Sequence, residues 1–249
     1  MIVLKSEREI KQMLEACRIS AEALKVAGEA VAPGVSTWEI DRIARRFIES
    51  KGAKPTFLNY NGFPAAACIS INDEVIHGIP DKAHILKSGD IVSIDLGACI
   101  NGYTGDTAAT FACGDVSAEA TRLMETTEAS LYEGIAKAVP GGRLGDVGSA
   151  IQVYCEERGY SVVRDYTGHG VGASLHEDPA VPNYGTPGRG VRLVPGMTIA
   201  IEPMINEGKA AVKTLPNGWT VKTTDGKLSA HFEHTVAITS SGPLIMTKL

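Results

Sequence analysis

Apolar residues near the start of the chain recur every three to four positions, which is the period of an amphipathic helix. One such run covers residues 10–24 and a second covers residues 40–48. Each follows a Ser that has Glu three positions later, at Ser6 and at Ser36. This capping-box pattern starts helices, because the two side chains satisfy free backbone N–H groups. The pattern predicts two helices, the first ending near Gly28.

Strand-like apolar runs follow in residues 91–111, on either side of Asn101-Gly102. Asn-Gly favours a two-residue hairpin turn, because both residues accept a positive φ. In that register Asp95 and Asp106 are diagonal neighbours on one face, about 7–8 Å apart at the backbone. Two acids on an apolar hairpin repel each other and need a counter-charge. The pair indicates metal ligation, whereas a lone Asp near a turn would be only a cap.

The second half of the chain repeats the order of the first. Adding 107 to the numbering maps the first Pro-Gly break, the second helix and the acid-bearing strand onto later counterparts, with Asp95 falling on Glu202. A repeat of this kind indicates duplicated structural units. We therefore expect pseudo-symmetric αβ halves, approximately residues 1–114 and 115–249, within a single catalytic domain of residues 1–249. They should share one sheet, with the helices on one face.

Composition narrows the class of protein. The chain has 249 residues, 44% of them hydrophobic, and a net charge of −5, which suits a soluble globular protein and argues against nucleic-acid recognition. Its five cysteines are scattered and never form C-x-x-C, which fits a reducing compartment. No apolar run approaches the roughly 18 residues of a membrane span, and no signal peptide is visible. A cytoplasmic location without membrane contact is expected.

Three side chains of the second half complete a candidate metal site. Glu202 ends a short buried strand, Glu233 lies on one face of a predicted strand over residues 229–238, and His169 is flanked by glycines that leave room for its imidazole. Together with the two hairpin acids they suit Mn, Fe(II), Co or Zn. Four carboxylates carry more charge than one dication balances. Two ions about 3.5–4 Å apart fit better, and they would bring the pKa of a bound water near neutral.

An ordered set of motifs now points to a family: IDLGACINGYTGDTAATF, TGHGVG, LHEDP, IAIEPM and HFEHTV. The set resembles the type I methionine aminopeptidases, which have the pita-bread metallopeptidase fold, and the likeness covers nearly the whole chain. It implies an α+β fold whose pseudo-symmetric halves share a curved, mainly antiparallel sheet with the helices on the outer face. It also implies a compact, monomeric enzyme that removes the initiator methionine from nascent polypeptide N-termini, prefers a small second residue, and has the ribosome as a candidate partner.

The resemblance assigns a role to each candidate ligand. The five ligands of the family fall on Asp95, Asp106, His169, Glu202 and Glu233. Asp106 and Glu233 would bridge two divalent ions, Asp95 would chelate one, and His169 and Glu202 would hold the other. Co, Mn, Fe(II), Zn and Ni are all candidates for these ions. Glu202 would also move a proton from the attacking water to the leaving amine.

The resemblance also assigns the substrate contacts. His77 and His176 would flank the scissile amide, the first at its nitrogen and the second at its carbonyl. The methionine side chain would enter a pocket lined by Tyr60, Phe63, Cys68 and Trp219, with Phe57 and Leu175 nearby. An apolar slot that tolerates sulfur would accept an unbranched thioether.

The sequence allows more than one interpretation of His231 and of the function. His231 replaces a glutamine of the best-known bacterial members, and it either lies behind the ligands or is a partly exposed strand histidine. Asn72 and Ser229 match positions that hold a monovalent cation in relatives. Two other functions fit the same fold: a proline-specific peptidase, and a binding protein that has lost catalysis. The second alternative is weakened because all five ligands are present.

Overall fold

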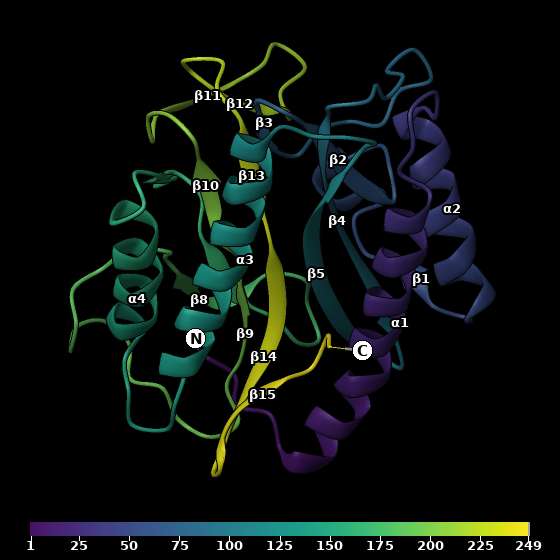
Figure 1. Ribbon diagram of the computed structural model, residues 1–249. Helices are drawn as coiled ribbons and strands as arrows, with labels where there is room; N and C mark the ends of the chain where they lie inside the picture. The colour runs from purple at the N-terminus through teal and green to yellow at the C-terminus, as the bar shows by residue number, and fades with distance from the viewer. Residues whose placement is uncertain (249) are drawn as a thin grey trace.

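The computed structural model describes residues 1–248, and within them four α-helices form two pairs on one side of a long sheet (Figure 1). The helices are α1 (Glu7–Glu29), α2 (Thr37–Ser50), α3 (Ala118–Lys137) and α4 (Leu144–Glu156), with a short 3₁₀ turn, η1 (Tyr60–Gly62). Both predicted capping boxes are present, at Ser6 and Ser36, and Ser117 caps α3. Helix α2 begins at Thr37 and α4 begins at Leu144, which is 107 residues later, as the predicted repeat requires.

The main sheet has nine strands, and all of its pairs are antiparallel. Its central path runs β1 (Lys54–Pro55), β4 (Ile91–Ile100), β5 (Tyr103–Ala112), β14 (Glu233–Thr239), β9 (Thr198–Ile201), β7 (Gly168–Gly170) and β8 (Glu177–Val181). β2 (Ala67–Ile71) pairs with β4, and β15 (Gly242–Ile245) pairs with β14. The path therefore crosses from first-half strands to second-half strands where β5 meets β14.

Two small sheets flank this path, each with three strands. One contains β13 (Ser229–His231), β10 (Met204–Asn206) and β6 (Ser161–Val162), and the other contains β11 (Val212–Thr214), β12 (Val221–Thr223) and β3 (Glu74–Ile76). None of the helices among residues 1–248 combines the length and apolar character that crossing a bilayer requires.

The central hairpin has the predicted register. Asn101 and Gly102 form its turn with φ of 55° and 80°, and Gly97 pairs with Asp106. Successive strand residues point to opposite faces, so Asp95 faces away from the buried core that its neighbour Ile94 joins. The hairpin thus presents its acids on the face opposite the helices.

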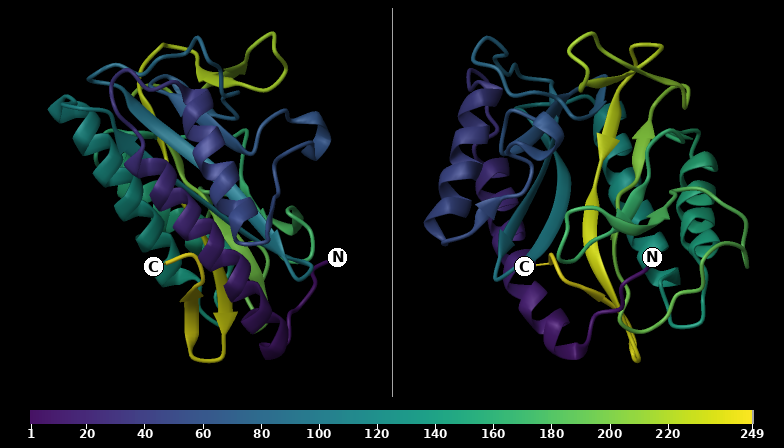
Figure 2. Two further views of the ribbon diagram at one scale, coloured as in Figure 1. Left: turned by 90° about the vertical axis from the view of Figure 1, so that its right-hand side faces the viewer. Right: turned by 180° about the vertical axis from the view of Figure 1, so that it is seen from behind.

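Two apolar cores lie between the helices and the sheet, one for each half. The first contains Ile40 of α2 and Ile94 of β4, and the second contains Ile151 of α4 and Ile199 of β9. Seen from behind in Figure 2, the central strands β5 and β14 have no helix over them. The prediction of two αβ halves sharing an antiparallel sheet with helices on its outer face is confirmed, and the inner face remains open for a site.

Helix α1 lies unusually close to the strand that carries Asp106. A Cβ atom on Gly105 would stand 2.4 Å from the Cα of Cys17, so only glycine allows this approach. Ser20 of α1 donates a hydrogen bond to the carbonyl oxygen of Gly105 at 2.9 Å and accepts one from the N–H of Ala98 at 3.0 Å. Helix α1 therefore holds β5 in place at the residue next to Asp106.

The predicted strand over residues 229–238 is wrong in one respect, because the chain bends within it. β13 ends at His231 and β14 begins at Glu233, while β9 and β10 are likewise separated by Glu202 and Pro203. Pro203 has no N–H to continue a ladder. Its carbonyl oxygen instead accepts a hydrogen bond from the N–H of Phe232 at 3.3 Å. The chain therefore leaves the main sheet at Glu202, after β9, and enters it again at Glu233, where β14 begins.

Candidate active site

A pocket of about 230 Å³ gathers every residue that the sequence proposed for catalysis, divalent metal binding and substrate binding. These residues are Phe57, Tyr60, Phe63, Cys68, His77, Asp95, Asp106, His169, Leu175, His176, Glu202, Trp219 and Glu233. They come from both halves of the chain and from loops far apart in sequence. The structure therefore brings these thirteen residues together.

Sheet register explains how the acids converge. Ala108 of β5 pairs with Asp95 of β4 on one side and with Glu233 of β14 on the other, so all three face the pocket. Asp106 lies two residues along β5 and shares that face. Glu202 follows directly after β9, whose pairing with β14 runs toward Glu233. The small side chain of Ala108 leaves space between the carboxylates.

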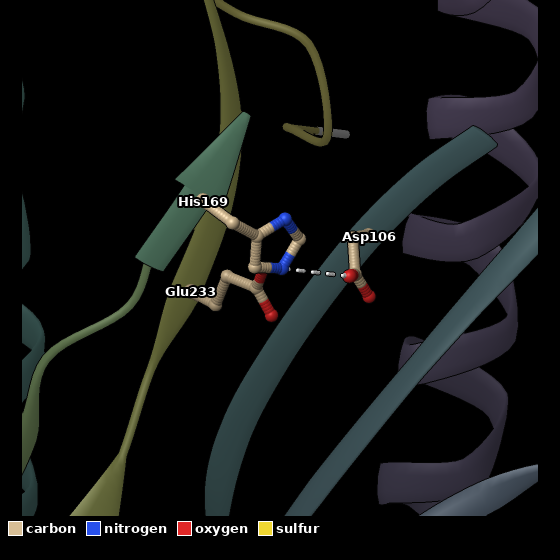
Figure 3. Close-up of side chains that lie close together, drawn as sticks. All are labelled: Asp106, His169 and Glu233. Carbon is tan, nitrogen blue, oxygen red and sulfur yellow. Dashed lines mark ion pairs between the residues drawn. The ribbon is translucent and has the colours of Figure 1, made fainter. Parts of the chain in front are cut away.

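His169 projects from β7 toward these acids (Figure 3). Its Nε2 atom lies 3.6 Å from Asp106 Oδ2 and 3.6 Å from Glu202 Oε1. One donor atom from each of Asp106, His169 and Glu233 lies within 4.8 Å of the others, as a shared cation would require. His169 Nδ1 is 2.8 Å from the carbonyl oxygen of Gly170. A carbonyl can only accept, so Nδ1 carries the proton and the Nε2 lone pair faces the acids.

The glycines beside His169 have a different cause from the predicted one. A Cβ on Gly168 would lie 2.2 Å from the carbonyl oxygen of Ala200, and a Cβ on Gly170 would lie 2.2 Å from that of Asp178. They allow neighbouring strands to approach, and they do not make room for the imidazole. The narrow spacing holds β7 between β8 and β9.

The carboxylates lack the partners that buried charges need. Asp95 Oδ1, Asp106 Oδ1 and Glu233 Oε1 are buried and make no hydrogen bond within residues 1–248. Burial raises the pKa of Asp106 to about 7. Burial, followed by the charges of neighbouring acids, also raises the pKa values of Asp95, Glu202 and Glu233. Unpaired carboxylate oxygens around a shared space are what a divalent cation binds, so the residues present fit such an ion.

The histidines of the pocket are neutral near pH 7. Burial, and then the neighbouring His176, lowers the pKa of His77 and of His169 to about 4. Burial lowers the pKa of His176 as well. A neutral imidazole offers one donor and one acceptor, so His169 can ligate a cation and the other two can hydrogen-bond a substrate.

His77 and His176 line the same pocket and are each held by different neighbours. His77 has a φ of 58°, in the left-handed region that non-glycine residues rarely adopt and that often marks functional sites. The ring of Tyr166 stands perpendicular to it at a centroid distance of 5.8 Å. His176 Nδ1 lies 2.8 Å from the hydroxyl of Tyr60, and its ring centroid is 4.1 Å from that of His169.

An apolar cluster lines part of the pocket. It contains Phe57, Phe63, Ala65, Cys68 and Leu175, with Tyr60, Ile79 and Trp219 packed against them. Phe63 and Trp219 meet edge to face with their ring centroids 5.2 Å apart. Aromatic rings and a thiol around a slot beside four acids suit a flexible apolar side chain attached to a polar group.

Comparison with known proteins agrees with this geometry. The profile of metallopeptidase family M24 matches residues 11–240. This chain belongs to metallopeptidase family M24. It is 53% identical over 247 residues to the methionine aminopeptidase of Clostridium acetobutylicum, with 99% of each chain covered. Its fold is similar to that of the methionine aminopeptidase of Thermotoga maritima, with a TM-score of 0.98, 44% identity and 100% of both chains covered.

A proline-specific relative is more distant. The prolidase of Pyrococcus furiosus has a TM-score of 0.79 and 27% identity, and the match covers 99% of this chain but 66% of that one. The resemblance inferred from the sequence motifs is therefore confirmed. As an M24 metallopeptidase, the protein uses divalent metal ions, consistent with its buried Asp-His-Glu cluster.

In this M24 metallopeptidase His231 lies behind the acids. The residue is 1% exposed, so the alternative interpretation as a partly exposed strand histidine is wrong. Its Nε2 atom is 3.6 Å from Glu202 Oε2 and has no hydrogen-bond partner within the described chain. Burial, and then the neighbouring His77, lowers its pKa to about 3. A neutral imidazole therefore lies beside the carboxylate of Glu202.

Asn72 and Ser229 lie together outside the pocket, where the N–H of Ser229 donates to the carbonyl oxygen of Asn72 at 2.8 Å. Four pocket residues were missed by the sequence reasoning: Asn61, Ile76, Tyr166 and Thr167. Thr167 begins the glycine-flanked motif of His169, which was a usable signal. Asn61 lies in the short 3₁₀ turn η1 and Tyr166 lies in an irregular segment, where periodicity gives no information about the direction of a side chain.

Proposed function

We propose that this M24 metallopeptidase removes the N-terminal initiator methionine from nascent proteins and peptides. One observation carries the proposal: an apolar cluster that contains a thiol lines the same pocket as a group of buried acids and neutral histidines. Relatives about half identical over the full chain are methionine aminopeptidases, which supports the same activity here.

Two divalent ions would be held by Asp95, Asp106, His169, Glu202 and Glu233. Mn, Co, Fe(II), Zn and Ni all accept this set of oxygen and imidazole donors. When bound, the ions supply Lewis acidity for the scissile carbonyl and lower the pKa of water toward neutrality.

Glu202 is the group that would carry the proton. Burial and the neighbouring acids raise its pKa, so its carboxylate is a stronger base than an exposed glutamate. It would take the proton from the attacking water and deliver it to the leaving amine. Asn183 fixes the backbone at this point by donating to the carbonyl oxygen of Glu202 at 2.9 Å.

The two neutral histidines would hold the amide. If the Tyr60 hydroxyl donates to Nδ1 of His176, the proton of that imidazole resides on Nε2, which can then donate to the carbonyl oxygen of the substrate. His77, held in its strained backbone conformation, would contact the amide nitrogen. The free amine of the substrate would lie at the divalent ions, which would restrict cleavage to the first residue. Crowding at the entrance would favour a small second residue.

Release of methionine from the peptide Met-Ala-Ser in the presence of Mn or Co tests the proposal. We expect rapid release from this peptide and no cleavage of Ala-Pro. Asp95→Ala and Glu233→Ala should abolish turnover, and the exposed control Asp115→Asn should retain it. Cleavage of Ala-Pro alone would favour a proline-specific peptidase. If the metal-loaded protein releases neither product, it is a binding protein of the same fold.

The wider setting follows from the same proposal. We expect a monomer of one catalytic domain in the cytoplasm, where nascent N-termini would be met at the ribosome. All five cysteines are free and four are buried, which fits a reducing compartment. Light scattering tests the monomeric state, and co-sedimentation with ribosomes tests contact with the ribosome. Titration with potassium tests the proposed binding of a monovalent cation near Asn72 and Ser229.

A further inference from the structure

A buried ion pair lies directly behind His176. Lys5 precedes α1, and its side chain is 4% exposed, while the side chain of Glu177 is 12% exposed. Nζ of Lys5 donates to Oε2 of Glu177 and to the carbonyl oxygen of Val3 at 3.1 Å. Buried lysines are rare unless they are paired. Glu177 is the first residue of β8, so the pair is one residue from His176 along the chain.

The ion pair also organises the loop of residues 171–176, which joins the strand of His169 to His176. A Cβ on Gly172 would lie 2.4 Å from Cε of Lys5, so the lysine side chain lies directly on the loop backbone. Oε1 of Glu177 accepts a hydrogen bond from the N–H of Ser174 at 3.2 Å. The loop is thereby tied to a charged pair that water reaches poorly.

The N-terminal segment that supplies Lys5 is itself anchored to the sheet. The N–H of Lys5 donates to the carbonyl oxygen of Gly196 at 2.7 Å, in the turn before β9. The terminal ammonium of Met1 pairs with Asp178 of β8, and the N-terminus lies beside β8 in Figure 1. Neither Lys5 nor Glu177 lines the pocket. Any effect of this segment on catalysis must therefore pass through the loop.

We propose that the N-terminal segment of residues 1–5 is a strap that positions His176 for catalysis through the Lys5–Glu177 pair. Removal of the lysine charge leaves the poorly exposed carboxylate of Glu177 without a charged partner, and such a group draws in water or moves outward. Movement of Glu177 carries His176 with it, because the two are adjacent. Lys5 is thus a positioning residue for the reaction, and this inference rests on the proposed aminopeptidase function.

Lys5→Met tests the strap, because methionine keeps an unbranched apolar side chain and removes the charge. Lys51→Met is the matched control, since Lys51 pairs with Glu22 at 3.0 Å on the surface with 39% exposure. With Mn-loaded enzyme and Met-Ala-Ser, well below the unfolding temperature, we expect Lys5→Met to lower kcat by about tenfold to a hundredfold with little change in KM. Lys51→Met should match the unmodified enzyme.

The imidazole NMR signals of metal-free protein give a second readout that needs no activity. His176→Asn identifies the His176 signal. In Lys5→Met that signal should shift or broaden, while the signal of the exposed His84 stays in place. A merely structural lysine would lower the unfolding temperature and leave kcat and the His176 signal unchanged, which would overturn the proposal.

A second variant covers the case in which Lys5→Met fails to fold. Glu177→Gln keeps the size of the side chain and an oxygen for the N–H of Ser174, and it removes the negative charge. Normal kcat together with an unshifted His176 signal in this variant would also overturn the strap. If the unmodified enzyme releases no methionine, the proposed function fails, while the His176 signal in Lys5→Met still decides whether the segment positions the loop.

Discussion

Asp106→Asn should stabilise the metal-free protein while it abolishes peptide cleavage. The side chain of Asp106 is 4% exposed, its Oδ1 has no hydrogen-bond partner within residues 1–248, and burial raises its pKa to about 7. In the unfolded chain the pKa returns to 3.8. Between these two values the folded protein holds a proton that the unfolded chain has released. The contribution of the neutral carboxyl to the free energy of unfolding is therefore fully present below pH 3.8, and it is lost as the pH rises through about 7.

The size of the effect follows from the shift. About three pKa units at roughly 1.4 kcal/mol each give an upper bound of about 4 kcal/mol above pH 7. Asparagine keeps the shape and never ionises, so we expect Asp106→Asn to raise the free energy of unfolding by about 2–4 kcal/mol at pH 8. At pH 5 the gain should be smaller by about 2 kcal/mol, because the folded wild-type carboxyl is still protonated there.

Urea unfolding with a chelator present, at pH 5 and pH 8, measures this directly. Asp115→Asn is the control, because Asp115 is exposed and should change stability by no more than about 0.5 kcal/mol. Added Mn should stabilise the wild-type protein and should stabilise the Asp106→Asn variant much less. An Asp106→Asn variant that is less stable than wild type at pH 8 without metal would refute the view that this carboxylate is an uncompensated buried charge.

Four further outcomes follow from the geometry. Mn at about a hundred times its Kd should raise the free energy of unfolding of wild type by about 2.7 kcal/mol, and equal stabilisation of Asp95→Ala in thermal scans would contradict the ligand assignment. His231→Leu should weaken Mn binding by about tenfold to a hundredfold in calorimetry, and His231→Gln, which keeps a donor, should restore most of it. Phe63→Ala should raise KM for Met-Ala-Ser by about tenfold, and an unchanged KM would place the methionine side chain elsewhere. Gly105→Ala, whose Cβ would lie 2.4 Å from Cys17 Cα, should destabilise by about 3 kcal/mol in urea unfolding, and a neutral result would show that α1 can move away.

The parts of the fold that sequence predicted are those where a local rule and the global fold agree. The hairpin register was obtained to the residue, because Asn101-Gly102 admits one short turn and the alternation admits one buried face. The capped helices followed from Ser6 and Ser36 for the same reason. The acid pair Asp95 and Asp106 came directly from that register. The second-half ligands needed the internal repeat and the family resemblance.

The parts that sequence missed depend on contacts between distant segments. The bend at Phe232 arises because Pro203, far away in the sequence, lacks an N–H and offers its carbonyl oxygen instead. The glycines around His169 are required by carbonyl groups of neighbouring strands, which no local pattern reveals. The left-handed backbone of His77 is likewise imposed by its surroundings. Long-range packing, and not local propensity, decided these features.

The proposed ligands are divided between two halves that each have their own apolar core. Asp95 and Asp106 belong to the first half, whereas His169, Glu202 and Glu233 belong to the second. A molecule in which either half has unfolded would therefore lack part of the proposed ligand set. We expect hydrolysis only from molecules in which both halves are folded against each other, so the folded state itself would control when this peptidase is active.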